Sequence, residues 1–169
     1  MKQKLPKVII LCGGLGTRIK SISRELPKSM VKIHGKPFIQ YQLELLKKNN
    51  LNDIILCVAQ GSSIIENFVG DGRSFGLDVK YSYDGSNLLG TGGAIKNSLR
   101  NVNEYFFVIY GDSYLDINYK EVYDYYLLND KKSVLTVFEN NNLLDRSNII
   151  FKNNKILTYC KNSDDKEMT

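Results

Sequence analysis

A glycine-rich segment directly follows a short apolar run near the start of the chain. Residues 8–12 read VIILC, and positions 13–18 read GGLGTR. Glycine has no Cβ, so a loop rich in glycine can turn several backbone N–H groups toward an anion. Arg18 adds a planar fork of donors that matches phosphate oxygens. We therefore expect this loop to bind phosphate.

A second cation, Lys28, stands ten residues after Arg18 and directly follows Pro27. Two cations beside a glycine-rich loop form a clamp that suits a triphosphate. A dinucleotide-binding fingerprint that began at Gly14 would need a glycine where Ile19 stands, and no Gly-Lys-Ser/Thr of a Walker loop occurs. A plain tight turn would account for the first two glycines but not for the two cations.

Elements that alternate along the chain must position these residues. Short apolar or alternating runs predict strands, and apolar residues with a 3.6-residue period predict helices. The expected strands are 7–12, 53–58, 78–83, 105–110 and 133–139, with a hairpin of 148–151 and 155–159 around Asn153-Asn154. The expected helices are 37–49, with Pro37 at its first position, 63–69, 91–99 and one that follows Asn118.

This alternation predicts an α/β fold, in which a mostly parallel, Rossmann-like sheet carries helices on both faces. Ligands of such sheets bind beyond the carboxyl ends of the strands. The glycine loop leaves its strand at that edge, and Gly111-Asp112 leaves strand 105–110 at the same edge. We expect one domain over residues 1–169, because no internal repeat, low-complexity tract or linker interrupts the chain.

Two helix starts carry capping-box patterns. Ser63 is followed by Glu66, and Asn118 is followed by Glu121. Tyrosines then recur with helical spacing at positions 119, 123 and 126. We expect these rings to pack against the sheet rather than to stack nucleic-acid bases.

Composition and charge narrow the class of protein. The 169 residues are 43% hydrophobic and 24% charged, with a net charge of +5, as in ordinary globular domains with a mild positive excess. The lysines form no basic stripe with interleaved aromatics, so we expect phosphate substrates and no nucleic-acid partner. No run suits a transmembrane helix or a signal peptide, so we expect a cytoplasmic protein without a membrane partner.

The thiols and the single histidine carry no catalytic pattern. Cys12, Cys57 and Cys160 are widely spaced and form no CxxC pair, so we expect buried, reduced thiols rather than disulfides or a zinc site. His34 has no second histidine to work with, and we interpret it as structural.

Three separate motifs together resemble the signature of the sugar nucleotidyltransferases. They are GGLGTR at 13–18, LPKSM at 26–30 and GKP at 35–37. Two departures are visible, because the family usually has alanine where Cys12 stands and often has proline where Ser29 stands. Neither residue supplies chemistry. Segments 110–114 (YGDSY) and 145–148 (DRSN) are similar to those of the heptose- and mannose-1-phosphate guanylyltransferases.

The resemblance implies that a sugar 1-phosphate oxygen attacks the α-phosphorus of a nucleoside triphosphate, giving an NDP-sugar and pyrophosphate for surface glycan biosynthesis. GTP and a heptose- or mannose-type sugar are favoured. The protein would hold two polyanions together and neutralise developing charge, with Mg²⁺ as cofactor bridging phosphate oxygens.

The resemblance also assigns roles to individual residues. Arg18, Lys28 and Asp112 are the expected catalytic residues, and Asp112 would hold Mg²⁺. Lys161 and Asn148 would contact the sugar phosphate and the sugar. The nucleotide-binding set, besides the two cations, comprises Leu11, Gly13, Gly14, Gly16, Thr17, Asp84, Leu89, Gly90 and Thr91.

Plainer roles stay open for three of these residues. Asp112 follows a buried strand and could also cap a loop. Asp84 is also a turn residue beside Gly85, and Lys161 lies in a polar tail where a solvated side chain is common.

Members of the family usually continue with another strand and helix that carry a second metal-binding aspartate. Residues 163–169 (SDDKEMT) are polar and close no element, so we expect a C-terminally incomplete domain that binds nucleotide but turns over poorly. Two alternatives stay open: a cytidylyltransferase for a small phosphorylated alcohol, and a non-catalytic nucleotide-binding module. A homo-oligomer is compatible with the sequence.

Overall fold

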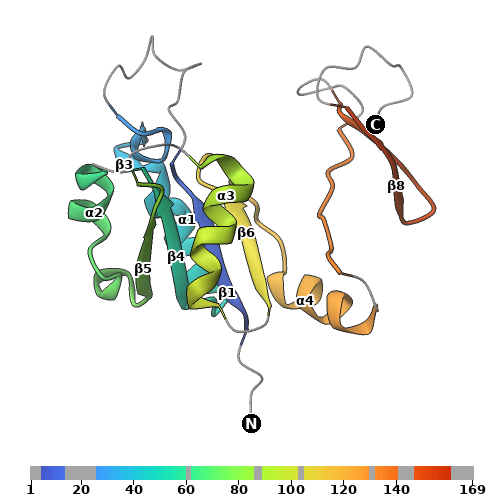
Figure 1. Cartoon of the computed structure of the whole chain (residues 1–169), viewed down its shortest axis with the longest axis horizontal. Coiled ribbons are helices and arrows are strands. Elements are labelled where there is room, and N and C mark those ends of the chain that lie inside the picture. Colours follow the sequence, from blue (N-terminus) through green and yellow to red (C-terminus); the bar gives the residue numbers. More distant parts are fainter. Residues whose placement is uncertain are drawn as a thin grey trace. The chain divides into compact units, whose positions relative to one another are not determined.

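The chain divides into two compact units, Met1–Leu128 and Asn129–Thr169. The computed structural model describes residues 5–13, 26–59, 62–85, 89–102, 105–129, 132–140 and 147–160. The first unit contains the layered α/β structure, and the second contains a β-hairpin (Figure 1).

A four-stranded parallel sheet forms the centre of the first unit. Its strands, in the order β5-β4-β1-β6, are β5 (Asp78–Tyr83), β4 (Asp53–Val58), β1 (Lys7–Leu11) and β6 (Phe106–Tyr110). Val8 pairs with Ile54 on one side and with Phe107 on the other. Val8, Ile9 and Ile10 are completely buried, as a continuous apolar run in an interior parallel strand predicts. The expected parallel sheet is confirmed.

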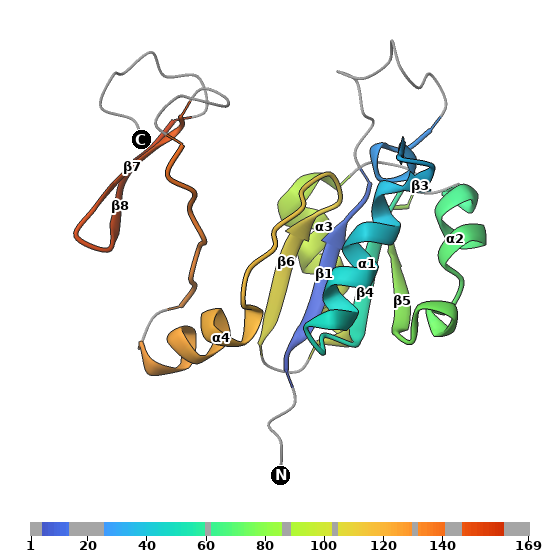
Figure 2. The same ribbon diagram turned by 180° about the vertical axis from the view of Figure 1, so that it is seen from behind.

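Helices cover both faces of this sheet (Figure 2). One core cluster joins β1 and β4 to residues of α1, α2 and α4, and a smaller cluster on the opposite face contains Ile9, Ile55 and Ala94 of α3. The expected two-sided α/β architecture is therefore confirmed. The helices are α1 (Phe38–Lys48), α2 (Ser63–Val69), α3 (Gly90–Ser98) and α4 (Tyr119–Leu128).

Short elements lie in residues 26–37 of the connection between β1 and α1, and the sequence patterns did not predict them. The 3-10 turn η2 (Lys28–Met30) is followed by the small hairpin of β2 (Lys32–Ile33) and β3 (Lys36–Pro37). His34 and Gly35 have φ values of 47° and 82° at its turn, which gives His34 the structural role expected for it. Two more 3-10 turns are η3 (Arg73–Phe75) and η4 (Leu99–Asn101).

One of the two capping boxes forms. The Glu121 amide donates to Asn118 Oδ1 at 3.3 Å, while Asn118 Nδ2 donates to Glu121 Oε1 at 2.7 Å. The box at Ser63 is wrong, because Ser63 is already helical and the residue before it, Ser62, bonds its hydroxyl to the Ala59 carbonyl at 2.6 Å.

Pro37 likewise lies just before its helix rather than at the first helical position. Its ψ of 141° is extended, so α1 starts at Phe38.

Tyr119 and Tyr123 of α4 pack on the sheet side of the helix as expected. Tyr119 is 2% exposed, and its ring meets Phe107 of β6 edge-on at 5.6 Å between centroids. Tyr123 is also buried and lies 6.1 Å from the ring of Tyr105. Aromatic pairs of this geometry add to burial in fixing a helix on a sheet.

The second unit contains the expected hairpin of β7 (Ile149–Lys152) and β8 (Lys155–Tyr159). Asn153 and Asn154 have φ values of 52° and 58°, as a two-residue type I′ turn requires. The strand predicted for 133–139 is wrong, because this segment forms no regular element. Alternating hydropathy suits a pleated surface but supplies no neighbouring strand to pair with.

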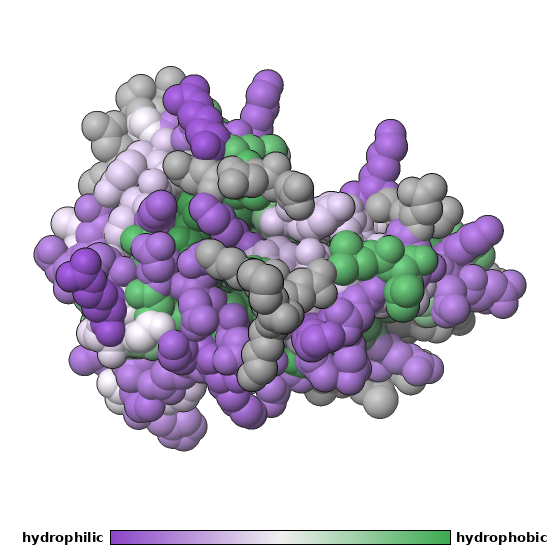
Figure 3. Space-filling view, turned by 90° about the horizontal axis from the view of Figure 1, so that it is seen from below, coloured by the Kyte–Doolittle hydropathy of each residue, from purple (hydrophilic) through white to green (hydrophobic). Residues whose placement is uncertain are grey.

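Among the described residues, no helix is long and apolar enough to cross a membrane. Seen from the side opposite the carboxyl ends of the strands, the visible surface is mainly hydrophilic (Figure 3).

Candidate functional site

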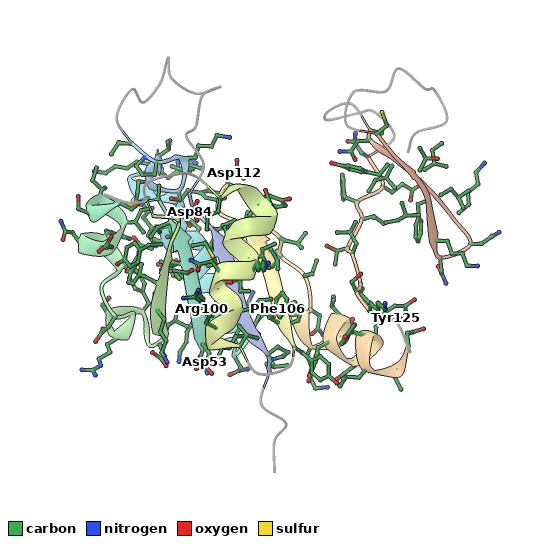
Figure 4. All side chains as sticks on the ribbon, in the orientation of Figure 1. Asp53, Asp84, Arg100, Phe106, Asp112 and Tyr125 are labelled. Carbon is green, nitrogen blue, oxygen red and sulfur yellow. The ribbon has the colours of Figure 1, made fainter. Side chains whose placement is uncertain are left out.

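Acidic side chains from two strands meet the end of β1 at the carboxyl edge of the sheet. Asp84 directly follows β5, and Asp112 lies two residues after β6. Figure 4 shows both at this end of the first unit, whereas Asp53 and Arg100 lie at the opposite end. The parallel order β5-β4-β1-β6 therefore places both carboxylates beside the start of the glycine-rich loop.

Lys28 and Asp112, two of the three residues expected to be catalytic, form an ion pair. Lys28 Nζ lies 2.9 Å from Asp112 Oδ2, with side-chain exposures of 30% and 46%. The two residues are 84 positions apart, so the fold brings them together. At this exposure, water screens the attraction and the pair adds little to stability. The same exposure leaves the Lys28 ammonium group accessible to a polyanion and the Asp112 carboxylate accessible to the counter-ion of that polyanion.

Gly111 brings the end of β6 against the end of β1. Its amide donates to the Leu11 carbonyl at 3.0 Å. A Cβ on Gly111 would lie 2.7 Å from that carbonyl oxygen and 2.9 Å from Cys12 Sγ, distances that real Cβ atoms do not tolerate. This close approach sets Asp112 directly beside the first residues of the loop.

Asp84 connects three parts of the expected nucleotide-binding set. Its Oδ2 accepts a hydrogen bond from the Leu89 amide at 3.4 Å, and the same oxygen lies 3.3 Å from where a Cβ on Gly13 would stand. Gly13, Asp84 and Leu89 therefore lie close together.

Gly90 and Thr91 open helix α3 next to that group. Both are exposed, and Gly90 has a φ of 69°, which favours glycine. The first amides of a helix have no carbonyl partner within it and carry a partial positive charge. This end of α3 can therefore receive an oxygen-rich ligand.

Gln42 was not predicted as a site residue, yet it holds the turn that carries Asp112. This α1 side chain is 3% exposed, and its Nε2 donates to the Tyr110 carbonyl at 2.8 Å and to the Ser113 carbonyl at 2.7 Å. Gln42 lies three residues after Ile39 on the buried stripe of the helix. A polar residue in such a stripe is the signal that could have found it.

Asn97 of α3 has a similar position on the other face of the sheet. Its Nδ2 donates to the Tyr83 carbonyl at 3.0 Å and to Ser82 Oγ at 3.2 Å. These bonds hold the end of β5 just before Asp84. No sequence pattern pointed to this residue.

The cysteines offer no nucleophile at this edge. Burial raises the pKa of the Cys12 thiol to about 12 and that of the Cys57 thiol to about 11, so both stay protonated near neutral pH and are poor nucleophiles. All three cysteines are free, as expected. The expectation of burial is wrong for Cys160, which is exposed because β8 leaves its residues open to solvent.

Several predicted site residues do not belong to the described part of the first unit. Asn148 belongs to the second unit, where it is exposed and its carbonyl accepts a bond from the Cys160 amide at 2.9 Å. The others fall outside the described residues and are Gly14, Gly16, Thr17, Arg18 and Lys161.

A parallel sheet with helices on both faces, and with a cation, two carboxylates and an exposed helix start at its carboxyl edge, is the architecture of a nucleotide-binding α/β protein. Residues 7–144 match the Nucleotidyl transferase family. The chain belongs to this family.

Relatives with known names agree on the transferase class. The chain is 39% identical over 135 residues to D-glycero-alpha-D-manno-heptose 1-phosphate guanylyltransferase of Campylobacter jejuni, a match that covers 80% of this chain and 58% of the relative. It is 48% identical over 52 residues to choline-phosphate cytidylyltransferase of Streptococcus pneumoniae, covering 31% of this chain and 23% of that protein. The chain spans little more than half the length of the guanylyltransferases it matches.

A solved structure shares the fold and is similar in sequence. The crystal structure of HddC from Yersinia pseudotuberculosis complexed with GMP-PN superposes with a TM-score of 0.64 at 39% identity. The match covers 73% of this chain and 55% of that one. The likeness therefore extends over most of the residues that form the α/β unit.

Proposed function

We propose that this chain forms the nucleotide-binding part of an enzyme that joins a nucleoside monophosphate to a sugar 1-phosphate and releases pyrophosphate. One observation carries the proposal: Lys28, Asp112, Gly13 and Asp84 gather at one edge of the sheet. Phosphate, cation and base contacts are needed together in such a reaction. The match to a heptose 1-phosphate guanylyltransferase supports GTP and a heptose-type sugar. We propose the mannose-type alternative and a role in surface glycan biosynthesis on the family resemblance alone.

The catalytic task of this edge is charge neutralisation. Lys28 would contact phosphate oxygens, and Arg18 of the glycine-rich loop would add bidentate bonds. These cations would offset charge on the α-phosphate and on departing pyrophosphate. No covalent intermediate on the protein is required.

Asp112 fits the role of Mg²⁺ ligand. Its side chain is 46% exposed. Gly111, the residue before it, packs against the end of β1. Among the described residues, no three His, Cys, Asp or Glu side chains group as a metal site. Protein sites often hold Mg²⁺ through one or two carboxylates together with substrate phosphates. When bound, Mg²⁺ would neutralise phosphate charge and orient the triphosphate.

The base and the sugar would occupy the α3 side of the edge. Asp84 and the backbone at Leu89 and Gly90 would contact the base, with Thr91 at the helix start nearby. Lys161 and Asn148 would contact the sugar phosphate and the sugar. We propose these two contacts on the family resemblance alone.

Pyrophosphate release tests the proposal. Each of the four NTPs is offered with Mg²⁺ to a panel of sugar 1-phosphates, with Asp112→Asn as the test variant. Asp78→Asn, the same change at the amino end of β5, is the matched control. Release that needs both substrates, and that is lost only in Asp112→Asn, is the expected result.

Nucleotide binding separates turnover from recognition. We expect GTP to bind the chain with Mg²⁺ and to lose affinity in Arg18→Ala and Asp112→Asn, even where turnover is slow. Equal binding by these variants and the wild-type chain would contradict the proposed site.

A second candidate is transfer of CMP to a small phosphorylated alcohol. The 48% identity to a choline-phosphate cytidylyltransferase favours this candidate, although the match is confined to 52 residues. CTP with choline phosphate therefore belongs in the panel. Release only with that pair would replace the sugar assignment.

A further inference from the structure

Gln42 makes an unusual use of a buried helix position. Its neighbours on the inner face of α1, Ile39, Leu43 and Leu46, are all at most 1% exposed. The amide of Gln42 is buried with them, and its Oε1 has no hydrogen-bond partner among the residues that the structure describes. Burying an amide oxygen without a partner is unfavourable. An apolar side chain would suit packing better at this position.

The side-chain nitrogen of Gln42 makes the hydrogen bonds that an apolar residue could not make. Both Nε2 bonds go to backbone carbonyls, Tyr110 at 2.8 Å and Ser113 at 2.7 Å. Two facing carbonyls accept and cannot donate, so the nitrogen must be the atom that points at them. The Ser113 amide also donates to the Tyr110 carbonyl at 3.1 Å, closing a turn over residues 110–113. Gln42 thus holds both ends of that turn.

Asp112 is the third residue of this turn, and its direction follows from the turn's geometry. One side of the turn is fixed by Gly111, which packs on Leu11 and Cys12. Gln42 of α1 holds the Tyr110 and Ser113 carbonyls at the other side of the turn. Without the amide, the backbone of this turn would be held by the Gly111 contact and the Ser113–Tyr110 bond alone, and the ion pair with Lys28 would be the one remaining restraint on the carboxylate among the described residues.

We propose that Gln42 is a positioning residue, which sets the affinity of Asp112 for the divalent cation that accompanies the nucleotide. The inference rests on the proposed function, because it takes Asp112 as the metal ligand. Groups that orient a ligating carboxylate typically change metal affinity by about 10- to 100-fold when they are removed. Gln42 does so through backbone carbonyls rather than by touching the carboxylate.

The test uses Mn²⁺ as the probe, with its binding to the full chain in the presence of GTP followed by electron paramagnetic resonance. Gln42→Met keeps the length and removes both donors. Gln40→Met is the matched control, because Gln40 lies on the same helix and bonds to Glu44 at 2.7 Å. We expect Mn²⁺ affinity to fall about 10-fold in Gln42→Met and to stay unchanged in Gln40→Met.

Two further readouts separate positioning from folding. The Tm of Gln42→Met is expected to stay close to that of the wild-type chain, because methionine removes the unpaired oxygen as well as the donors. GTP affinity measured in EDTA is also expected to be unchanged. A variant that only loosened the fold would lower the Tm and weaken both forms of GTP binding together.

Two more variants keep the inference falsifiable if Gln42→Met folds poorly. Gln42→Asn keeps the amide but withdraws it by one methylene, so an intermediate Mn²⁺ affinity is expected. Gln42→Glu places a carboxylate opposite two carbonyls and should bind Mn²⁺ most weakly of all. Mn²⁺ affinities equal to the Gln40→Met control in the folded variants would overturn the inference.

Asp112→Asn distinguishes the two levels of failure. If this variant binds Mn²⁺ as well as the wild-type chain, the metal role in the proposed function fails, and the inference fails with it. If Asp112→Asn loses Mn²⁺ but Gln42→Met does not, only the positioning role of Gln42 is overturned.

Discussion

Lys28 Nζ and Asp112 Oδ2 lie 2.9 Å apart, so the expected phosphate-binding cation and the expected metal ligand are each other's counter-ion. A bound Mg²⁺–nucleotide would exchange this one ion pair for two, since the cation would take the carboxylate and the phosphate would take the ammonium group. The exchange would let the site accept a polyanion without leaving either group unpaired.

Replacing Lys28 by glutamine should therefore affect binding far more than stability. The pair is partly exposed, so the free energy of unfolding should change by no more than about 1 kcal/mol. GTP affinity should fall about 10-fold or more, as the loss of a charged hydrogen bond predicts. Urea denaturation and fluorescence titration measure the two quantities. Lys36→Gln, which breaks the comparably exposed pair with Glu44 at 3.2 Å, should leave GTP affinity unchanged.

Gly111→Ala should destabilise the first unit. The new Cβ would stand 2.7 Å from the Leu11 carbonyl oxygen, and forcing backbone apart in a packed interior costs about 1–3 kcal/mol. The midpoint of urea denaturation reports the loss. Gly92→Ala is the control, since a Cβ there meets nothing within 4 Å and alanine favours the helix. A Gly111→Ala chain as stable as the wild type would contradict the packing described for this turn.

Sequence reasoning recovered the elements whose signals are local. The run 53–58 is buried on both faces, and the strand predicted from it has the same first and last residues as β4. The two asparagines at 153–154 predicted their turn because few residues adopt positive φ. The strand predicted for residues 133–139 does not form. Its alternating hydropathy is a local signal, whereas a strand also needs a neighbouring strand to pair with, and a local pattern does not show one.

The site was predictable in its charged residues and not in the residues that hold them. Asp112 and Asp84 stand beside glycines at strand ends, and Lys28 follows Pro27 soon after the glycine-rich loop; both patterns have a chemical meaning. Gln42 and Asn97 act through backbone carbonyls that are distant in sequence. Only the register of α1 and α3 against the sheet brings those carbonyls within reach.

Asn97→Ala should weaken the base side of the site and leave the metal side intact. It removes donors to Tyr83 and Ser82 at the end of β5, where Asp84 begins. A neutral hydrogen bond contributes about 1 kcal/mol, so GTP affinity should fall roughly fivefold. In the Asn97→Ala chain, Mn²⁺ affinity measured with GTP present should fall by no larger factor than GTP affinity falls.

Asn49→Ala provides the comparison for that variant. It also removes a side-chain bond to a carbonyl, that of Leu45 at 2.9 Å, but at the far end of α1. If both alanine variants lower GTP affinity equally, the effect of Asn97 is general destabilisation rather than placement of Asp84.

Alkaline pH should destabilise the fold through Cys12. Burial raises the pKa of this thiol from 9.0 to about 12, so above pH 9 the unfolded chain releases a proton that the folded chain keeps. The thiol therefore favours folding below that pH, and this contribution is lost as pH rises toward 12. Each pH unit in this window favours unfolding by about 1.4 kcal/mol. Cys12→Ala should flatten the slope of unfolding free energy above about pH 9 by nearly one proton.

Urea denaturation at a series of pH values measures that slope. Cys57, whose pKa burial raises to about 11, and Tyr81 and Tyr119, both raised to about 12, keep part of the pH dependence in the Cys12→Ala chain. An unchanged slope in Cys12→Ala would mean that the Cys12 thiol reaches solvent in the folded chain, and the close contact of Gly111 with Cys12 would then have to open as well.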